Sequence, residues 1–451
     1  MSVSIIGPFT SNPFSSSTGH DDTIMKVYYE LCRGVQSDTR ARFAFYMWNY
    51  DDGSYSSFTP KVITDALTGP SLSSRESYDV KILLDVDHYS DDPEHEKYPN
   101  YEAYTRLKEA FGNRRVSLVK KKEMGLGEES GFAMHLKLIT IDKITFDNEC
   151  VVDELRGKTL EHVVTVSSAN IWGESQYYSA NDLILFHGDK DLYEEAFACW
   201  EQAEKDATPT SGYCEGFTQD ARTDKKFDNV KWYYFPRKKD DVVEDIVKNM
   251  RTSMDTFDSW WSRTWNLENK TKARLSMAYF TEGRLGVAQE LGLVDDYYHS
   301  DVKTVLRFHD ITDDPTDSSD DESVEKNKNL YESVINELEH HEIATTILPT
   351  SGSTPLLHNK FLTFRGRYPL SGTTEYRKIV WTGSHNYTHS ALRNNAETMV
   401  RIEDDTIYDT YKSYFDLLMD STESADTGHL VVAIVVGVLL IAGAVTAILI
   451  F

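Results

Sequence analysis

Short apolar runs alternate with longer amphipathic segments along most of the chain, and these runs recur in the same order in its two halves. Residues 42–48 (RFAFYMW) and 274–280 (RLSMAYF) predict strands, because aromatic and aliphatic side chains dominate runs too short for a stable helix. Residues 79–84 and 301–306 both begin Asp-Val-Lys and predict the next strand of each half. Their offset of 222 positions (301 − 79) indicates an internal repeat.

The repeat continues beyond these strands. Each half next has a helical pattern, at 101–111 and 329–340. The apolar runs and small polar motifs that follow are at 134–141, 163–170, 357–364 and 379–386. Because strands alternate with helices in both copies, the pattern predicts α/β sheets with helices packed outside them.

The repeat also predicts the domain boundaries. A first half covers 1–211, a polar linker covers 212–228 and a second half covers 229–420. A polar spacer at 421–429 leads to residues 430–451 (LVVAIVVGVLLIAGAVTAILIF), which contain no charged side chain. At ~1.5 Å per residue this run is about 33 Å long as a helix, enough to cross a bilayer. It predicts a transmembrane helix, because a buried helix of this length would normally show a polar face.

The N-terminal residues bear on which side of the membrane the globular part is expected to lie. Residues 1–22 lack a basic segment followed by a long apolar one, so they do not resemble a secretory signal. We expect a single-pass tail anchor at the endoplasmic reticulum or a later membrane, with the globular part in the cytoplasm. A GPI signal is the alternative, because 421–428 is small and polar. Gly443 and Ala447 form a small-xxx-small pair through which tail helices could dimerise.

Composition and charge narrow the class of protein. Hydrophobic residues make up 40% and aromatic residues 12% of the chain, which argues against wholesale disorder. The net charge of -26 argues against a long nucleic-acid duplex as partner, because such binding neutralises phosphates with basic side chains. A phosphate ester in a local basic pocket is still compatible with an acidic surface. The four cysteines match no zinc or disulfide pattern.

The third apolar run of the first half, at 134–141, carries the first chemical motif, His135-Leu-Lys137, and Asp142 follows it. On a strand, residues two apart point to the same face, so His135 and Lys137 are predicted to project together into one cleft. Ser168 and Asn170 follow at the end of the next predicted strand. An acidic residue, Asp182, comes twelve residues after Asn170 (182 − 170).

The second half repeats this arrangement. It contains His358-Asn-Lys360, then Ser384 and Asn386, then Glu397. The two histidines are 223 positions apart (358 − 135), which matches the offset of the repeat within one residue. A single strand histidine is usually a packed core residue, but two such motifs at corresponding positions of a repeat indicate one shared active site.

These paired motifs resemble the phospholipase D superfamily, which is marked by two His-x-Lys-(x)4-Asp motifs, each followed by Gly-Ser-x-Asn. The resemblance covers nearly the whole chain before the apolar tail. It implies an α/β fold of duplicated phospholipase D-like α/β/α sandwich domains with one active site between the halves, plus the C-terminal transmembrane helix. Three positions depart from the pattern: Ser167 replaces a glycine, Asp182 a glutamate and Arg365 the second aspartate.

The resemblance also implies a role for each motif residue. His135 is expected to attack phosphorus and form a phosphohistidine, and His358 to protonate the leaving alcohol and then activate water. The groups expected to hold the phosphate oxygens are Lys137, Lys360, Asn170 and Asn386. Asp182 and Glu397 are each expected to orient one histidine through its second ring nitrogen. The residues expected to have supporting roles are Asp142, Ser168 and Ser384. No metal ion or cofactor is required, because the lysines supply the positive charge.

Three functions fit these observations. The first is cleavage or transfer of phospholipid head groups, since a membrane anchor raises the local concentration of a lipid substrate. The second is a membrane-anchored nuclease of the same superfamily that acts on single-stranded nucleic acid. The third is a catalytically silent membrane scaffold, which the replacement at Arg365 suggests.

Overall fold

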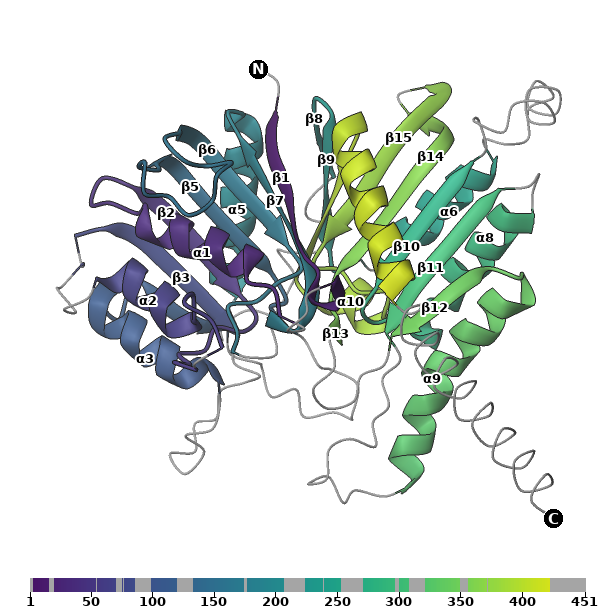
Figure 1. Cartoon of the computed structure of the whole chain (residues 1–451), viewed down its shortest axis with the longest axis horizontal. Coiled ribbons are helices and arrows are strands. Elements are labelled where there is room, and N and C mark those ends of the chain that lie inside the picture. The colour runs from purple at the N-terminus through teal and green to yellow at the C-terminus, as the bar shows by residue number, and fades with distance from the viewer. Residues whose placement is uncertain are drawn as a thin grey trace, which may run out of the picture.

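Two lobes lie side by side in the computed structural model, one from each half of the chain (Figure 1). The structure describes residues 3–15, 20–53, 55–69, 75, 77–85, 99–119, 133–173, 177–206, 224–237, 239–252, 271–296, 300–307, 321–348, 356–370 and 372–421. The expected transmembrane segment, 430–451, lies outside these ranges. Within them, no helix combines the length and apolarity that a membrane crossing requires.

The first lobe contains a mixed sheet of order β1-β7-β6-β5-β2-β3-β4, with β13 added beside β7. Its own strands are β1 (Ser4–Ser11), β2 (Arg40–Phe45), β3 (Asp79–Asp85), β4 (Val116–Val119), β5 (Lys137–Thr145), β6 (Thr159–Ser167) and β7 (Ser179–His187). Its helices are α1 (Thr23–Arg33), α2 (Pro60–Thr68), α3 (Pro99–Phe111) and α5 (Lys190–Asp206), with a 3-10 turn at Pro13–Ser15. Strands β2, β3 and β4 run parallel, and the other pairs among these seven are antiparallel.

The second lobe contains a sheet of order β12-β11-β10-β14-β15-β16-β9-β8. Its strands are β8 (Lys225–Phe227), β9 (Val230–Phe235), β10 (Lys272–Met277), β11 (Asp301–Arg307), β12 (Ala344–Leu348), β14 (Lys360–Leu370), β15 (Thr373–Gly383) and β16 (Glu397–Ile402). The two-residue strand β13 (Leu356–Leu357) belongs to this half of the sequence. The helices are α6 (Val242–Thr252), α8 (Leu285–Asp296), α9 (Asp321–His340) and α10 (His389–Arg393), a 3-10 turn at Glu282–Arg284, and a further helical segment at 405–421.

The two sheets share one topology, as the repeat in the sequence predicts. The parallel strands β2, β3 and β4 correspond to β10, β11 and β12, and the antiparallel strands continue in the same order on both sides. The match extends to single hydrogen bonds. Arg42 Nη1 donates to the backbone oxygen of Asp79 at 2.8 Å, and Arg274 Nη1 donates to that of Asp301 at 2.5 Å. Each arginine therefore joins the starts of the first two parallel strands of its lobe.

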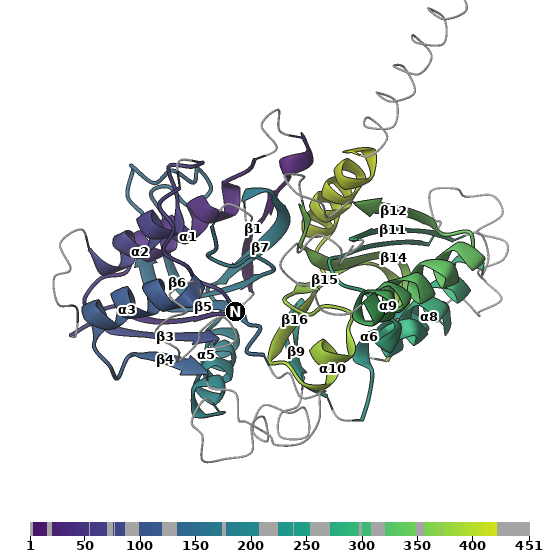
Figure 2. The ribbon, with the colours of Figure 1, turned by 90° about the horizontal axis from the view of Figure 1, so that it is seen from below.

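Three apolar clusters hold the molecule together. One packs α1, α2 and α3 on the outer face of the first sheet, and a second packs α6, α8 and α9 on the second sheet (Figure 2). The third cluster contains residues of both sheets together with α5 and the segment 405–421. Strand β16 is buried along its whole length, which explains why its sequence shows no apolar and polar alternation.

The chain crosses between the lobes at both His-x-Lys motifs. Met134 forms a parallel bridge with Ala396 of the second half, and only then does β5 begin in the first sheet, at Lys137. In the same way, β13 pairs with β7 of the first sheet before β14 begins in the second sheet, at Lys360. The prediction of one continuous strand through each motif was therefore wrong. Each histidine lies against the opposite lobe, while its lysine starts a strand of its own lobe.

The expected linker overlaps the second sheet. Residues 225–227 form the edge strand β8, which pairs antiparallel with β9. Residues 207–223 lie outside the described residues, so the boundaries proposed for the two halves stay predictions.

Candidate active site

The antiparallel sheet brings the polar motifs of each lobe together. Because β5 and β6 run in opposite directions, the start of β5 at Lys137 lies beside the end of β6 at Ser167. The same pairing places Lys360, at the start of β14, beside Gly383, at the end of β15. The segments before β5 and β14, which pair with the opposite lobe, then place His135 and His358 at the same location. The result is one site between the lobes, built from both halves of the repeat.

His135 is paired with a carboxylate from the second half. Its ring Nδ1 lies 2.8 Å from Glu397 Oε2, and its backbone N–H donates to Ala396 at 3.0 Å. Ser384 Oγ donates to the same Glu397 oxygen at 2.5 Å. Glu397 is fully buried, and this burial raises its pKa to about 8, although Lys137 and the Ser384 hydrogen bond act in the opposite direction. The predicted contact between Glu397 and a histidine ring is therefore present.

His358 is paired with an amide rather than with the predicted carboxylate. Its Nδ1 lies 2.8 Å from Asn181 Oδ1, and its backbone N–H donates to Ala180 at 3.0 Å. Ser168 Oγ donates to the same Asn181 oxygen at 3.1 Å. Burial, followed by the charges of Lys360 and Lys137, lowers the pKa of His358 well below its ordinary value. The expectation that Asp182 orients this ring is corrected, because Asn181 occupies that position.

Asp182 instead joins the two lobes behind the site. Its Oδ2 accepts hydrogen bonds from Thr382 Oγ1 on β15 and from the Tyr411 hydroxyl, the latter at 2.6 Å. The carboxyl is fully buried, and burial raises its pKa. Side chains of adjacent strand residues point to opposite faces, so Asn181 and Asp182 cannot both face the histidine.

The two lysines occupy equivalent positions. Lys137 Nζ donates to the backbone oxygen of His135 at 3.0 Å, and Lys360 Nζ donates to that of His358 at 2.5 Å. Both side chains are buried, which lowers the pKa of Lys137 to about 7 and that of Lys360 well below its ordinary value. Two nearby carboxylates raise the pKa of Lys137 part of the way back. A bound anion would therefore favour the charged form of both lysines.

The two asparagines follow the ends of β6 and β15. Asn170 Oδ1 accepts the backbone N–H of Met47 at 3.1 Å, which fixes its amide group. Asn386 Oδ1 is buried and has no hydrogen-bond partner among the described residues. In the described ranges, no three His, Cys, Asp or Glu side chains are grouped as a metal site would require.

The backbone differs between Gly383 and Ser167, which is the position where the first half departs from the glycine of the family pattern. Gly383 has a φ of 154°, and a Cβ built on it would lie 2.1 Å from the backbone oxygen of Thr398. No residue with a side chain fits there. In the first half, Ser167 Oγ instead donates to the backbone oxygen of Asp182 at 2.8 Å and accepts the N–H of Ala169 at 2.9 Å. The serine thus makes the turn with a hydrogen bond where the glycine makes it by close approach.

The third departure, Arg365, lies away from the histidines. Arg365 pairs with Lys272 and Lys378 in the sheet, and its Nε contacts the Tyr376 hydroxyl. The corresponding Asp142 accepts the backbone N–H of Arg40 at 2.9 Å. Both positions lie five residues beyond the motif lysines along β5 and β14 (142 − 137 and 365 − 360), so the replacement does not alter the contacts of the site.

Two residues that the sequence interpretation missed belong to the site. The ring of Tyr46 packs edge-on against His135 at 4.9 Å between centroids, and Lys137 Nζ lies 5.2 Å from the Tyr46 centroid. The other is Asn181. A constant offset of 216 relates Ser168 to Ser384, and the same offset relates Asn181 to Glu397 (397 − 181), so the register of the repeat could have identified it.

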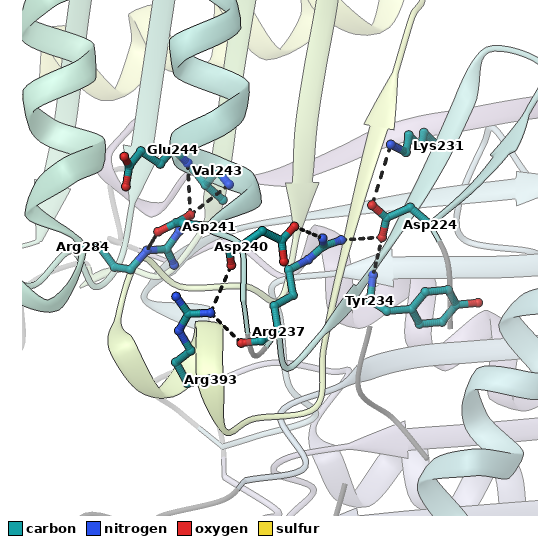
Figure 3. Close-up of polar contacts among 10 residues, drawn as sticks. All are labelled: Asp224, Lys231, Tyr234, Arg237, Asp240, Asp241, Val243, Glu244, Arg284 and Arg393. Atoms are coloured by element: carbon teal, nitrogen blue, oxygen red, sulfur yellow. Dashed lines mark hydrogen bonds and ion pairs between the residues drawn. The ribbon is translucent and has the colours of Figure 1, made fainter. Parts of the chain in front are cut away.

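A network of carboxylates and arginines joins the start of α6 to the 3-10 turn at Glu282–Arg284 (Figure 3). Asp241 caps α6 by accepting the backbone N–H groups of Val243 and Glu244, and it also accepts two hydrogen bonds from Arg284, at 2.7 and 2.6 Å. Arg284 Nη1 then lies 3.2 Å from Nε2 of His385, the residue between Ser384 and Asn386. Because an arginine only donates, the His385 Nε2 must be unprotonated. Burial, and next the positive charge of Arg284, lowers the pKa of His385.

Comparisons with known proteins agree with this fold. Residues 299–419 match the family model described as cardiolipin synthase, PLD-like domain. The solved structure of phosphatidylserine synthase from Haemophilus influenzae superimposes with a TM-score of 0.53 at 11% identity, covering 93% of this chain and 86% of that one. The mixed α/β two-sheet fold is therefore that of phospholipase D-like domains, and the matches support the phospholipase D superfamily.

Other solved structures are more distant. Polyphosphate kinase from Porphyromonas gingivalis gives a TM-score of 0.47 at 10% identity, covering 92% of this chain; this chain spans 50% of that kinase. Nuc of Salmonella typhimurium, a phospholipase D family member, gives a TM-score of 0.24 at 16% identity over 40% of this chain and 86% of that one. No curated protein matches the sequence.

Proposed function

We propose that the protein is a phospholipase D-type phosphodiesterase that cleaves or transfers phospholipid head groups through a phosphohistidine. The observation that carries this proposal is the pair of histidines held by ring contacts across the lobes, each with a buried lysine two residues away. Such a site can bind a phosphodiester between the two lysines and offer a ring nitrogen on each side of phosphorus. The likeness of 299–419 to a cardiolipin synthase domain supports a lipid as the substrate.

His135 is the better nucleophile of the two. When its Nε2 bonds to phosphorus, the imidazole becomes positively charged, and Glu397 is placed to stabilise that charge through Nδ1–H. His358 has a neutral amide at its Nδ1, so its protonated form gives up the Nε2 proton more readily. Its lowered pKa leaves the ring unprotonated in the free protein, and a bound phosphodiester anion favours the protonated form. That protonated form suits the role of general acid toward the leaving alcohol.

The reaction then has two balanced steps. In the first, the bond between His135 Nε2 and phosphorus forms, the bond from phosphorus to the head-group oxygen breaks, and His358 Nε2 gives its proton to that oxygen. In the second, His358 Nε2 takes a proton from water or an acceptor alcohol, whose oxygen bonds to phosphorus as the P–N bond breaks. Lys137, Lys360 and the two asparagine amides stabilise the phosphate oxygens in both transition states.

The proposed anchor at 430–451 would hold this site near a bilayer, with the globular part in the cytoplasm. Fusing the chain to a fluorescent protein and comparing its membrane fraction with that of a chain ending at residue 421 tests this placement. An unchanged membrane fraction in the shortened protein would rule out the tail as the anchor.

The decisive test of the activity is a comparison of two substrates. We expect the purified protein to release choline from phosphatidylcholine vesicles, and a His135→Ala protein to lose at least ~10²-fold of this rate. His340→Ala is the matched control, because His340 is exposed at the end of α9. Cleavage of single-stranded DNA without lipid turnover would favour the nuclease alternative, and no turnover of either would favour the silent scaffold.

The roles of the histidines can be assigned by trapping. A His358→Ala protein lacks both the general acid of the first step and the general base of the second. With a phosphorus-labelled nitrophenyl phosphodiester, whose leaving group needs no protonation, label is expected to reach His135 and remain there. Label found at another residue would reverse the assignment.

A further inference from the structure

Arg307 ends β11 beside the second motif. It corresponds to Asp85, which ends β3 in the first lobe, since both strands show the same offset of 222 (307 − 85) and pair in the same register with β2 or β10. The repeat therefore carries opposite charges at one structural position. The residue pattern alone gives no reason for this difference.

In the first lobe the residue at this position is Asp85, and it contacts the segment that carries His135. Asp85 Oδ2 accepts the backbone N–H of Met134 at 2.6 Å, and Met134 precedes His135. The carboxylate is 1% exposed, and its charge raises the pKa of Lys137 against the larger effect of burial. The negative charge of Asp85 is thus used inside the protein, on a backbone N–H and a lysine.

Arg307 has no comparable partner within the described ranges. Its Nη1 donates to the Tyr279 hydroxyl at 3.2 Å, and its guanidinium lies 5.2 Å from the centre of that ring. Among the described residues no carboxylate pairs with it, and its Nε is buried without an acceptor. The positive charge of Arg307 also lowers the pKa of His358 and that of Lys360, in addition to the effects of burial and of the motif lysines. A guanidinium with five N–H donors therefore has unused capacity next to the site.

The site is consequently polarised. Two carboxylates, Glu397 and Asp85, lie near the first motif, whereas the second motif has the neutral Asn181 and the cationic Arg307. The two lysines already suffice for a single phosphodiester charge. Arg307 adds a further positive charge on the side of His358.

We propose that Arg307 binds a second anionic group of the substrate, so that the preferred lipid has a head group that itself carries a phosphate. The inference rests on the proposed function. His358 protonates the leaving head-group oxygen there, so the head group lies on the side of Arg307. The diacylglycerol part of a phospholipid has no charge of its own, which leaves the head group to supply the second anion.

The activity test uses two lipids that differ by one phosphate. The full chain is assayed on phosphatidylcholine vesicles containing phosphatidylglycerol or phosphatidylglycerol phosphate. We expect kcat/KM to favour the second lipid by about 10- to 100-fold, the range of a hydrogen bond between charged groups. Arg307→Gln should bring this ratio near one, and Arg307→Lys should keep part of it. Lys303→Gln removes the same charge from the same strand and should leave the ratio unchanged.

A binding test separates this inference from the proposed activity. Calorimetry on the full-length His135→Ala protein compares glycerol 3-phosphate with glycerol 1,3-bisphosphate, the soluble counterparts of the two head groups. A preference for the bisphosphate that disappears in Arg307→Gln supports the assignment, even if neither lipid is cleaved and the proposed activity fails. Equal affinity for the two probes, or a preference that survives Arg307→Gln in a protein with unchanged thermal unfolding, overturns it.

Discussion

Glu397 combines burial with a hydrogen bond to His135, and this makes the stability of the protein depend on pH. Burial raises its pKa to about 8, from an ordinary value near 4.5 in the unfolded chain. Between these two values the folded protein binds more protons than the unfolded one. The stability contributed by this group is therefore present at about pH 4.5 and below, and it is lost as the pH rises toward 8.

A Glu397→Gln protein should lack this pH dependence. Its free energy of unfolding, measured with urea at pH 5, 6.5 and 8, should rise relative to wild type by up to roughly 1 kcal/mol per pH unit. An Asp142→Asn protein is the control, because Asp142 is a partly exposed carboxylate away from the histidines. A difference between Glu397→Gln and wild type that stays constant from pH 5 to 8 would contradict the raised pKa.

The site residues show what a single sequence can supply at this scale. The motif spacing identified His135, Lys137, His358 and Lys360 as one cluster, and the structure brings them together. The motif spacing did not identify Asn181, because the family pattern has an acidic residue at this place and the nearest acidic residue in the sequence is Asp182. An amide accepts the same hydrogen bond from a ring nitrogen, so residue charge alone was a misleading criterion.

Among the elements, the helical segment 405–421 links the two lobes through tyrosine hydroxyls. Tyr411 donates to the buried Asp182 of β7, whereas the hydroxyl of Tyr408, one turn earlier, is buried without a hydrogen-bond partner among the described residues. Tyr411→Phe should therefore cost about 1–3 kcal/mol of unfolding free energy, because it leaves a buried carboxyl with one partner fewer. Tyr408→Phe, its matched control on the same helix, should be nearly neutral. Equal losses in urea denaturation would contradict this role for the Asp182 contact.

The strands and helices were predictable where they stay within one lobe. The run at 42–48 became β2 at Arg40–Phe45, and the pattern at 101–111 became α3 at Pro99–Phe111. The strands at the two His-x-Lys motifs were not predictable in this way. Met134 and Leu357 pair with the opposite lobe before β5 and β14 begin. Hydrophobic periodicity reports which residues are buried, and it does not report which sheet buries them.

At the scale of the molecule, the two halves share one apolar cluster and exchange the segments that carry their histidines. Trp232 and Tyr411 of the second half pack in the same cluster as Trp200 and Ile184 of the first. A half expressed alone would expose this cluster and would lack the strand that holds its histidine. The halves should therefore fold together rather than separately, whatever the chain between them does.

This argument predicts the outcome of cutting the chain between the halves. With a protease site inserted within 207–223, the cleaved protein should elute as one particle in size-exclusion chromatography and unfold in a single cooperative transition, because the shared cluster and both crossings remain. Residues 1–211 produced alone should aggregate or bind an apolar dye, since the buried face of α5 is then open to water. The control is the same insertion left uncut, which should elute at the same volume. Two separate particles after cleavage, or a stable soluble first half, would mean that each lobe is an independent domain and that the site is assembled only on association.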